Sequence, residues 1–90
     1  MMIDKARRKI DELDTKIAKL LEERMETVAI IADYKKRHRL AIVDLAREQE
    51  IICRLKKRFA CSKYQRQLIN FFEFLINITR DYQKNHFNNK

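Results

Sequence analysis

The 90-residue chain contains no glycine, no proline and no tryptophan. Without Gly and Pro, the tight turns of β-hairpins and the Gly-rich loops that cradle phosphate groups lose the residues they require. Much of the remaining sequence consists of Leu, Ile, Lys, Arg, Glu and Ala, which favour α-helices. The composition therefore predicts an all-α fold.

Residues that hold metals or act as nucleophiles are also scarce. Cys53 and Cys61 form no Cys-x-x-Cys pair, and His38 and His86 lie in separate polar segments. A zinc site and a disulfide framework are therefore not predicted, and no Ser-His-Asp or Cys-His arrangement is evident. We expect a protein that uses neither a metal nor another cofactor.

Long apolar runs are missing as well. No segment approaches the ~20 apolar residues of a membrane span, and residues 1–9 are too polar for a signal peptide. We therefore expect a cytoplasmic protein without a membrane partner.

What the chain has in excess is positive charge, with a formal net charge of +8. This charge suits a nucleic acid, an anionic membrane surface or a small anion, and it selects none of them by itself.

Apolar residues recur every three or four positions between residues 3 and 36, which predicts one long helix. A polar stretch over residues 36–40 interrupts this period. Asp44 then suits the N-cap of a second, short helix. The apolar positions of that helix are Ile51, Ile52, Leu55 and Phe59.

A third helix of medium length is predicted from Ser62 to about Lys84. Ser62 and Gln65 fit the Ser-x-x-Gln capping box that starts many helices. The apolar positions of this helix are Leu68, Phe72, Leu75 and Ile76. Residues 85–90 are expected to fray.

The first helix is too long for one small domain. About 34 residues at ~1.5 Å per residue give roughly 50 Å, well beyond the span of a compact 90-residue globule. The two shorter helices cannot cover its whole apolar face. We therefore expect residues 1–90 to form a single domain that associates as an intertwined helical homodimer.

Cations lie where the core of this long helix is expected. Arg24 and Lys35 fall near the middle of its apolar arc, and Arg7 lies at the margin. Burial of an unpaired cation costs on the order of several kcal/mol, so anions must meet these side chains. The anions are either carboxylates of the same fold, with Glu48 as an available partner, or an anionic guest. Alternatively, the two side chains extend toward the ends of the fold and keep their charges in water.

Polar side chains also lie on the inner faces of the other two helices. Glu48 shares a face with the apolar residues of the second helix, and Arg47 lies beside it. Thr79 and Gln83 continue the apolar stripe of the third helix. Three helices thus direct polar groups inward, which predicts a pocket with an excess of cations, suited to a small dianion.

An ordered series of residues over most of the chain carries a resemblance to a known family. The series is Arg7-x-x-Ile10-x-x-Leu13-Asp14, then Arg24, Lys35, Val43-Asp44, Arg47-Glu48, Thr79 and Gln83. Each element is weak alone, but the whole series over residues 7–83 resembles the all-helical class of chorismate mutases. The resemblance implies a cofactor-free isomerase of the shikimate pathway and aromatic amino acid biosynthesis, which rearranges chorismate to prephenate.

The resemblance implies four catalytic residues in a pocket shared between two subunits. Lys35 and Gln83 would donate hydrogen bonds to the ether oxygen of chorismate, with Lys35 also near a carboxylate. Arg47 would contribute positive charge, and Glu48 would receive the ring hydroxyl of the substrate.

The resemblance also implies four substrate-binding residues. Arg7 would reach across the homodimer to a carboxylate in the partner's pocket, and Arg24 would hold a carboxylate in its own chain. Asp44 would lie near the ring hydroxyl, although a role as helix cap explains it equally well. Thr79 completes the set, at a position where better-known members have Ser.

The connecting segment 38–43 lacks the Gly and Pro often found in the family, so its backbone must turn without residues suited to special dihedral angles.

Two other functions remain open from the sequence. An isochorismate-pyruvate lyase uses the same fold and a similar cationic pocket, and the sequence separates it poorly from a mutase. A basic helical module that binds nucleic acid or a partner helix is the second, because Lys5, Lys9, Lys16 and Lys19 recur on the outer face of the first helix. No aromatic stacking platform accompanies them, so no nucleic-acid partner is predicted.

Overall fold

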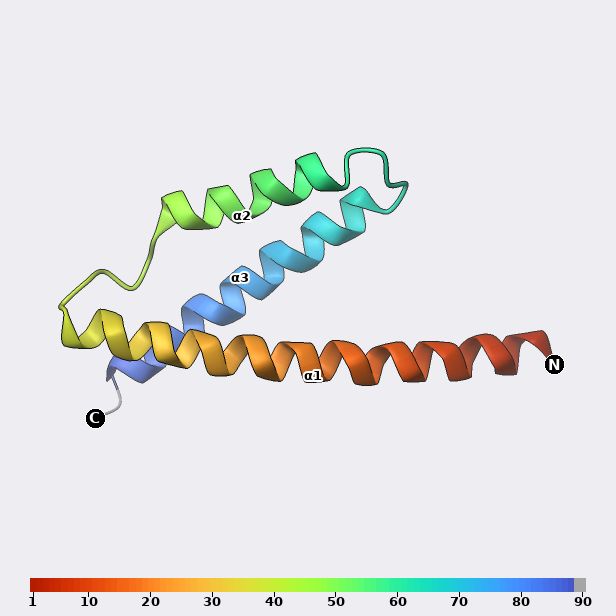
Figure 1. Ribbon diagram of the computed structural model, residues 1–90, viewed down its shortest axis with the longest axis horizontal. Helices are drawn as coiled ribbons and strands as arrows, with labels where there is room; N and C mark the ends of the chain where they lie inside the picture. The colour runs from red at the N-terminus through yellow and green to blue at the C-terminus, as the bar shows by residue number, and fades with distance from the viewer. Residues whose placement is uncertain (89–90) are drawn as a thin grey trace.

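The computed structural model describes residues 1–88, which form three α-helices and no strand (Figure 1). They are α1 (Met2–Arg37), α2 (Leu45–Arg58) and α3 (Gln65–Asn88). Helix α3 packs against both α1 and α2, whereas the backbones of α1 and α2 do not approach each other within this part of the chain. The predicted all-α fold with one long, one short and one medium helix is confirmed.

Helix α1 ends in a turn that normally uses glycine. The amide of Leu40 donates to the carbonyl of Lys35 at 2.8 Å, and the amide of Arg39 donates to the carbonyl of Lys36 at 3.3 Å, which together form a Schellman motif. Arg39 has a φ of 55°, in the left-handed region that costs a non-glycine residue about 1 kcal/mol. The chain thus turns without Gly by placing Arg39 in this conformation.

Helix α2 begins at the cap that the sequence predicts. The Asp44 carboxylate accepts a hydrogen bond from the backbone amide of Arg47 at 3.0 Å, which satisfies one of the free amides of the first turn. The predicted N-cap is therefore confirmed.

The predicted capping box at the start of α3 is wrong. The Ser62 hydroxyl accepts from the amide of Tyr64, and the Gln65 amide group donates to the carbonyl of Lys56 at 3.0 Å instead of turning back to Ser62. Helix α3 accordingly begins at Gln65. The reason is tertiary, because Gln65 uses its side chain to connect α3 to the last turn of α2.

The predicted end of α3 near Lys84 is also wrong, because the helix continues to Asn88. His86 lies in this extension, stacks on Tyr82 one turn earlier, and bonds the Asp33 carboxylate of α1 through Nε2 at 2.6 Å. These contacts stabilise turns that were expected to fray. Residues 89–90 of the expected frayed tail lie outside the described residues.

The core of one chain is small. Its buried apolar side chains are Val28, Ala32, Ile69, Leu75 and Ile76. The molecule measures 55 × 29 × 14 Å with a radius of gyration of 16.4 Å, whereas a compact 90-residue domain has about 12 Å. None of the helices in residues 1–88 is both long and apolar enough to cross a membrane.

The N-terminal part of α1 projects beyond the other two helices (Figure 1). Its apolar stripe is open to solvent, with exposed fractions between 42% and 63%. The residues of this stripe are Ile3, Ile10, Leu13, Ile17 and Leu20. One chain therefore leaves the face uncovered, as the length of the helix predicts.

Candidate functional site

A small cavity of about 70 Å³ lies where the C-terminal half of α1, the connecting loop, the start of α2 and the C-terminal half of α3 meet. Its lining residues are Arg24, Lys35, Ile42, Asp44, Arg47, Glu48, Ile51, Ile76, Thr79, Arg80 and Gln83. Four cations and two carboxylates among them leave a formal charge of +2. The structure thus brings seven of the eight candidate residues to one cavity, and Arg7 is the exception.

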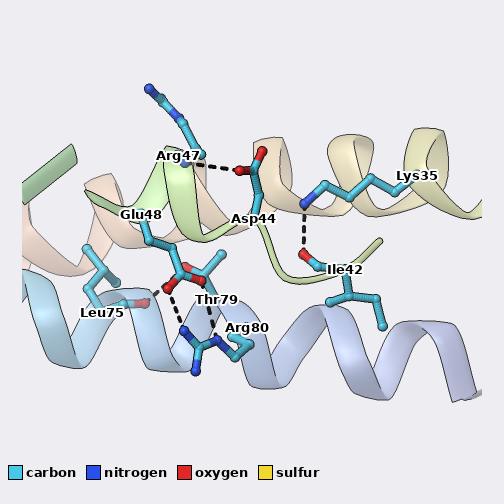
Figure 2. Close-up of polar contacts among 8 residues, drawn as sticks. All are labelled: Lys35, Ile42, Asp44, Arg47, Glu48, Leu75, Thr79 and Arg80. Carbon is cyan, nitrogen blue, oxygen red and sulfur yellow. Dashed lines mark hydrogen bonds and ion pairs between the residues drawn. The ribbon is translucent and has the colours of Figure 1, made fainter. Parts of the chain in front are cut away.

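Lys35 is held at the cavity by two neutral acceptors. Its ammonium Nζ donates to the carbonyl of Ile42 and to Oε1 of Gln83, both at 3.0 Å. Figure 2 shows the bond to Ile42, which connects α1 to the loop before α2. Gln83 is buried, with only 6% of its surface exposed. Because the oxygen of Gln83 accepts from Lys35, its NH₂ group remains as a donor.

Arg24 and Thr79 form a second connection, between α1 and α3. Nη1 of Arg24 donates to Oγ1 of Thr79 at 2.5 Å, and the Thr79 hydroxyl donates to the carbonyl of Leu75 at 2.9 Å. Burial lowers the pKa of the Arg24 guanidinium from its usual value, and the nearby charge of Arg47 lowers this pKa further. The site therefore holds a partly desolvated cation whose bonded partner is a neutral hydroxyl.

The carboxylate that was available to Arg24 and Lys35 is engaged elsewhere. Both oxygens of Glu48 accept from Arg80 of α3, with Nε at 3.3 Å from Oε2 and Nη2 in close contact with Oε1 (Figure 2). The alternative in which Glu48 neutralises Arg24 or Lys35 is therefore wrong. Among residues 1–88, no carboxylate bonds either of the two cations at the cavity.

Arg80 is a site residue that the sequence reasoning missed. It lies four residues after Ile76 and three before Gln83, and both of these residues are buried. Helical spacing therefore places Arg80 on the inner face of α3. This spacing was the available signal, although the polar stripe predicted from the sequence contained Thr79 and Gln83 and not the adjacent position.

Asp44 and Arg47 are at the edge of the cavity and are exposed. Asp44 caps α2 through its side chain. The guanidinium of Arg47 points away from Glu48 and Arg80 in Figure 2 and bonds Glu50 one turn later, which also accepts from Arg54. Both side chains are thus positioned by local contacts of α2.

Arg7 is exposed on the projecting part of α1. Along the helix it lies about 26 Å from Arg24, at ~1.5 Å per residue. The structure of one chain does not bring Arg7 to the cavity.

The arrangement can bind and orient an anion. Arg24 and Lys35 of α1 and the NH₂ group of Gln83 of α3 supply donors, and Glu48 of α2 supplies an acceptor. Within residues 1–88, no group of three or more His, Cys, Asp or Glu side chains could hold a metal ion. The chemistry that these side chains can perform is electrostatic stabilisation and positioning.

Comparison with known proteins supplies the family. A family model described as chorismate mutase type II matches residues 6–84, which include every candidate site residue. No curated protein and no solved structure matches the chain. The family match spans most of the sequence and agrees with the all-helical fold. The chain therefore belongs to the chorismate mutase type II family and is an isomerase, a chorismate mutase.

Proposed function

We propose that the cavity between α1, α2 and α3 is the active site, in which chorismate is rearranged to prephenate without a cofactor. The observation that carries the proposal is the pair of interior cations, Arg24 and Lys35, whose bonded partners are neutral oxygens. A fold retains such cations at an energetic cost, and a dianionic substrate offsets that cost when it binds.

Substrate binding requires the cavity to widen. Its volume of about 70 Å³ is below the ~300 Å³ of small ligand pockets. Arg24 and Lys35 exchange their bonds to Thr79 and Ile42 for bonds to substrate oxygens. Arg47 is exposed beside the cavity and turns from Glu50 toward a substrate carboxylate.

The reaction is a unimolecular rearrangement in which a carbon–oxygen bond breaks as a carbon–carbon bond forms. It needs no nucleophile. The protein restricts the flexible dianion to its reactive folded shape, and Lys35 and Gln83 direct donors at the ether oxygen where negative charge grows. Glu48 accepts the hydrogen of the ring hydroxyl, with Asp44 close by. Thr79, once its bond to Arg24 is exchanged, offers its hydroxyl to the bound substrate.

We further propose that the active unit is an intertwined homodimer. One chain has an accessible surface of 7825 Å², whereas a compact monomer of its mass of 11.0 kDa exposes about 5,600 Å². The excess of roughly 2,200 Å² per chain is in the range that obligate dimers bury. A largely apolar groove of about 550 Å³ between α1 and α3 continues the exposed stripe. Its lining includes Ile17, Leu20, Leu21, Leu68, Phe71 and Phe72.

In this dimer Arg7 serves the partner's pocket. Because Arg7 and Arg24 lie far apart on the same helix, the two residues of one chain cannot reach the same site. A second α1 packed alongside the first brings Arg7 of the partner subunit to the cavity, where it binds a substrate carboxylate. Each pocket is then composite.

The proposal is tested by following the loss of chorismate absorbance with purified protein after treatment with a chelator and desalting, and by identifying the product chromatographically. We expect prephenate to form at the same rate with and without added divalent metal. A parallel incubation with isochorismate monitors pyruvate. Stable chorismate would contradict the proposal, and pyruvate release from isochorismate alone would assign the lyase function instead.

A further inference from the structure

We infer that Arg80 is a positioning residue of the active site, which fixes the Glu48 carboxylate in the orientation that receives the substrate hydroxyl. The inference rests on the proposed function and adds to it a residue outside the predicted site. Arg80 acts through Glu48 and touches no substrate atom.

The first observation is the geometry of the ion pair. Two nitrogens of Arg80 bond the two oxygens of Glu48, which is the forked arrangement that fixes a carboxylate plane. The side chains are only 29% and 21% exposed. By contrast, the Arg54 and Glu50 side chains, paired within α2, are 63% and 57% exposed. Shielding from water makes the Arg80–Glu48 contact the stronger constraint.

The second observation is the place of the pair between two hollows. Glu48, Ile76 and Arg80 line the inner cavity and also an open groove of about 550 Å³ between α2 and α3. The groove is open to solvent and is also lined by exposed polar side chains of α2, among them Gln49 and Lys56. The bond to Arg80 therefore holds the Glu48 carboxylate in the wall between the two hollows. Without Arg80, the carboxylate is free to turn into the groove.

The third observation is the charge of the cavity. A carboxylate beside a dianionic guest repels it, and the fixed guanidinium of Arg80 neutralises Glu48 while leaving its oxygens able to accept a hydrogen bond. Loss of Arg80 reduces the formal charge of the lining from +2 to +1. The pair thus provides an acceptor without an excess of negative charge.

The test compares Arg80→Met and Arg80→Lys with Arg54→Met, which removes another arginine that pairs with a glutamate but lies outside the cavity. We expect Arg80→Met to lower kcat/KM by about 10-fold to 100-fold, as for residues that orient metal ligands. Most of the loss should be a rise in KM, because the hydroxyl contact already exists in the bound substrate. Arg80→Lys should recover part of the activity, and Arg54→Met should change kcat/KM less than about twofold.

A double-mutant cycle separates this role from a structural one. In a Glu48→Gln variant, the additional change Arg80→Met should lower kcat/KM by less than about twofold, because the group that Arg80 orients is already changed. Multiplicative losses in the double variant overturn the inference, as does full activity of Arg80→Met. If Arg80→Met does not fold, the cycle is run with Arg80→Lys. An inactive unmodified chain would instead refute the proposed function, so the two failures are distinguishable.

Discussion

At the residue scale, Lys35 is constrained at both ends. Its carbonyl accepts the 2.8 Å bond that closes the turn after α1, and its ammonium bonds the Ile42 carbonyl and Gln83. A half-buried ammonium without a carboxylate partner costs stability. Its fixed position at the cavity is therefore consistent with the proposed role in substrate binding and catalysis.

Replacement of Lys35 by Ala should lower kcat by about 10²-fold to 10³-fold, the usual cost of losing one preorganised donor at a developing negative charge. The circular dichroism spectrum and oligomeric state should be unchanged, because Nζ bonds one loop carbonyl and one side chain and belongs to none of the hydrogen bonds within the helices. Lys19→Ala, on the exposed outer part of α1, is the matched control and should retain full activity. A Lys35→Ala enzyme with near-normal kcat would refute the role.

The side-chain types of the site were predictable, but several of their partners were not. Helical spacing placed Arg24, Lys35 and Gln83 on inner faces, and the structure has them at one cavity. The acceptor for Lys35 is a backbone carbonyl in a loop, whose position no periodic pattern encodes. The spacing of Arg80 was informative, but its pairing with Glu48 was not predictable, because Glu48 lies on another helix.

At the scale of the helices, local signals predicted the ends of α1 and α2 within a residue or two, whereas tertiary contacts determine both ends of α3. Gln65 bonds the last turn of α2, and His86 bonds α1 through Asp33. Neither contact has a signature in neighbouring residues. The turn on Arg39 escaped prediction for a related reason, because its left-handed conformation carries no Gly or Asn signal.

The role of Asp44 as the N-cap of α2 can be separated from its proposed role near the substrate by two substitutions. Asp44→Ala removes the acceptor for the Arg47 amide and should lower the free energy of unfolding by about 1 kcal/mol. Asp44→Ser keeps a capping oxygen and should melt within a few degrees of the unmodified chain at equal protein concentration.

We expect Asp44→Ser nevertheless to lose much of its activity, because its hydroxyl cannot replace a carboxylate near the ring hydroxyl of the substrate. Thermal unfolding and kcat/KM are measured on the same preparations. If Asp44→Ser is both stable and fully active, Asp44 is a helix cap alone and is removed from the proposed site.

At the scale of the whole molecule, the 55 Å length of one chain and its small core support the proposed dimer. The sequence predicted the uncovered stripe from the length of the helix alone. It could not predict the excess surface of a single chain, because that quantity depends on how α3 crosses α1 and how little of the N-terminal half it covers.

If each pocket is composite, two inactive variants should regain activity when they are mixed, which is not expected of a site within a single chain. Arg7→Ala and Arg24→Ala homodimers should each be inactive. After mixing and subunit exchange, each heterodimer contains one pocket with both arginines intact, because Arg24 comes from one chain and Arg7 from the other. Random exchange makes about half of the molecules heterodimers, each with one good pocket of two, so about a quarter of the unmodified activity should return.

The matched control mixes Arg24→Ala with Lys35→Ala, two changes that the proposal assigns to the same chain of each pocket. Every pocket in that heterodimer carries one defect, so mixing should restore no activity. Subunit exchange is verified independently by mass spectrometry of intact dimers formed from tagged and untagged chains. Exchange without rescue in the first mixture would refute the shared pocket, and equal rescue in both mixtures would show that Arg7 and Lys35 belong to the same side of the site.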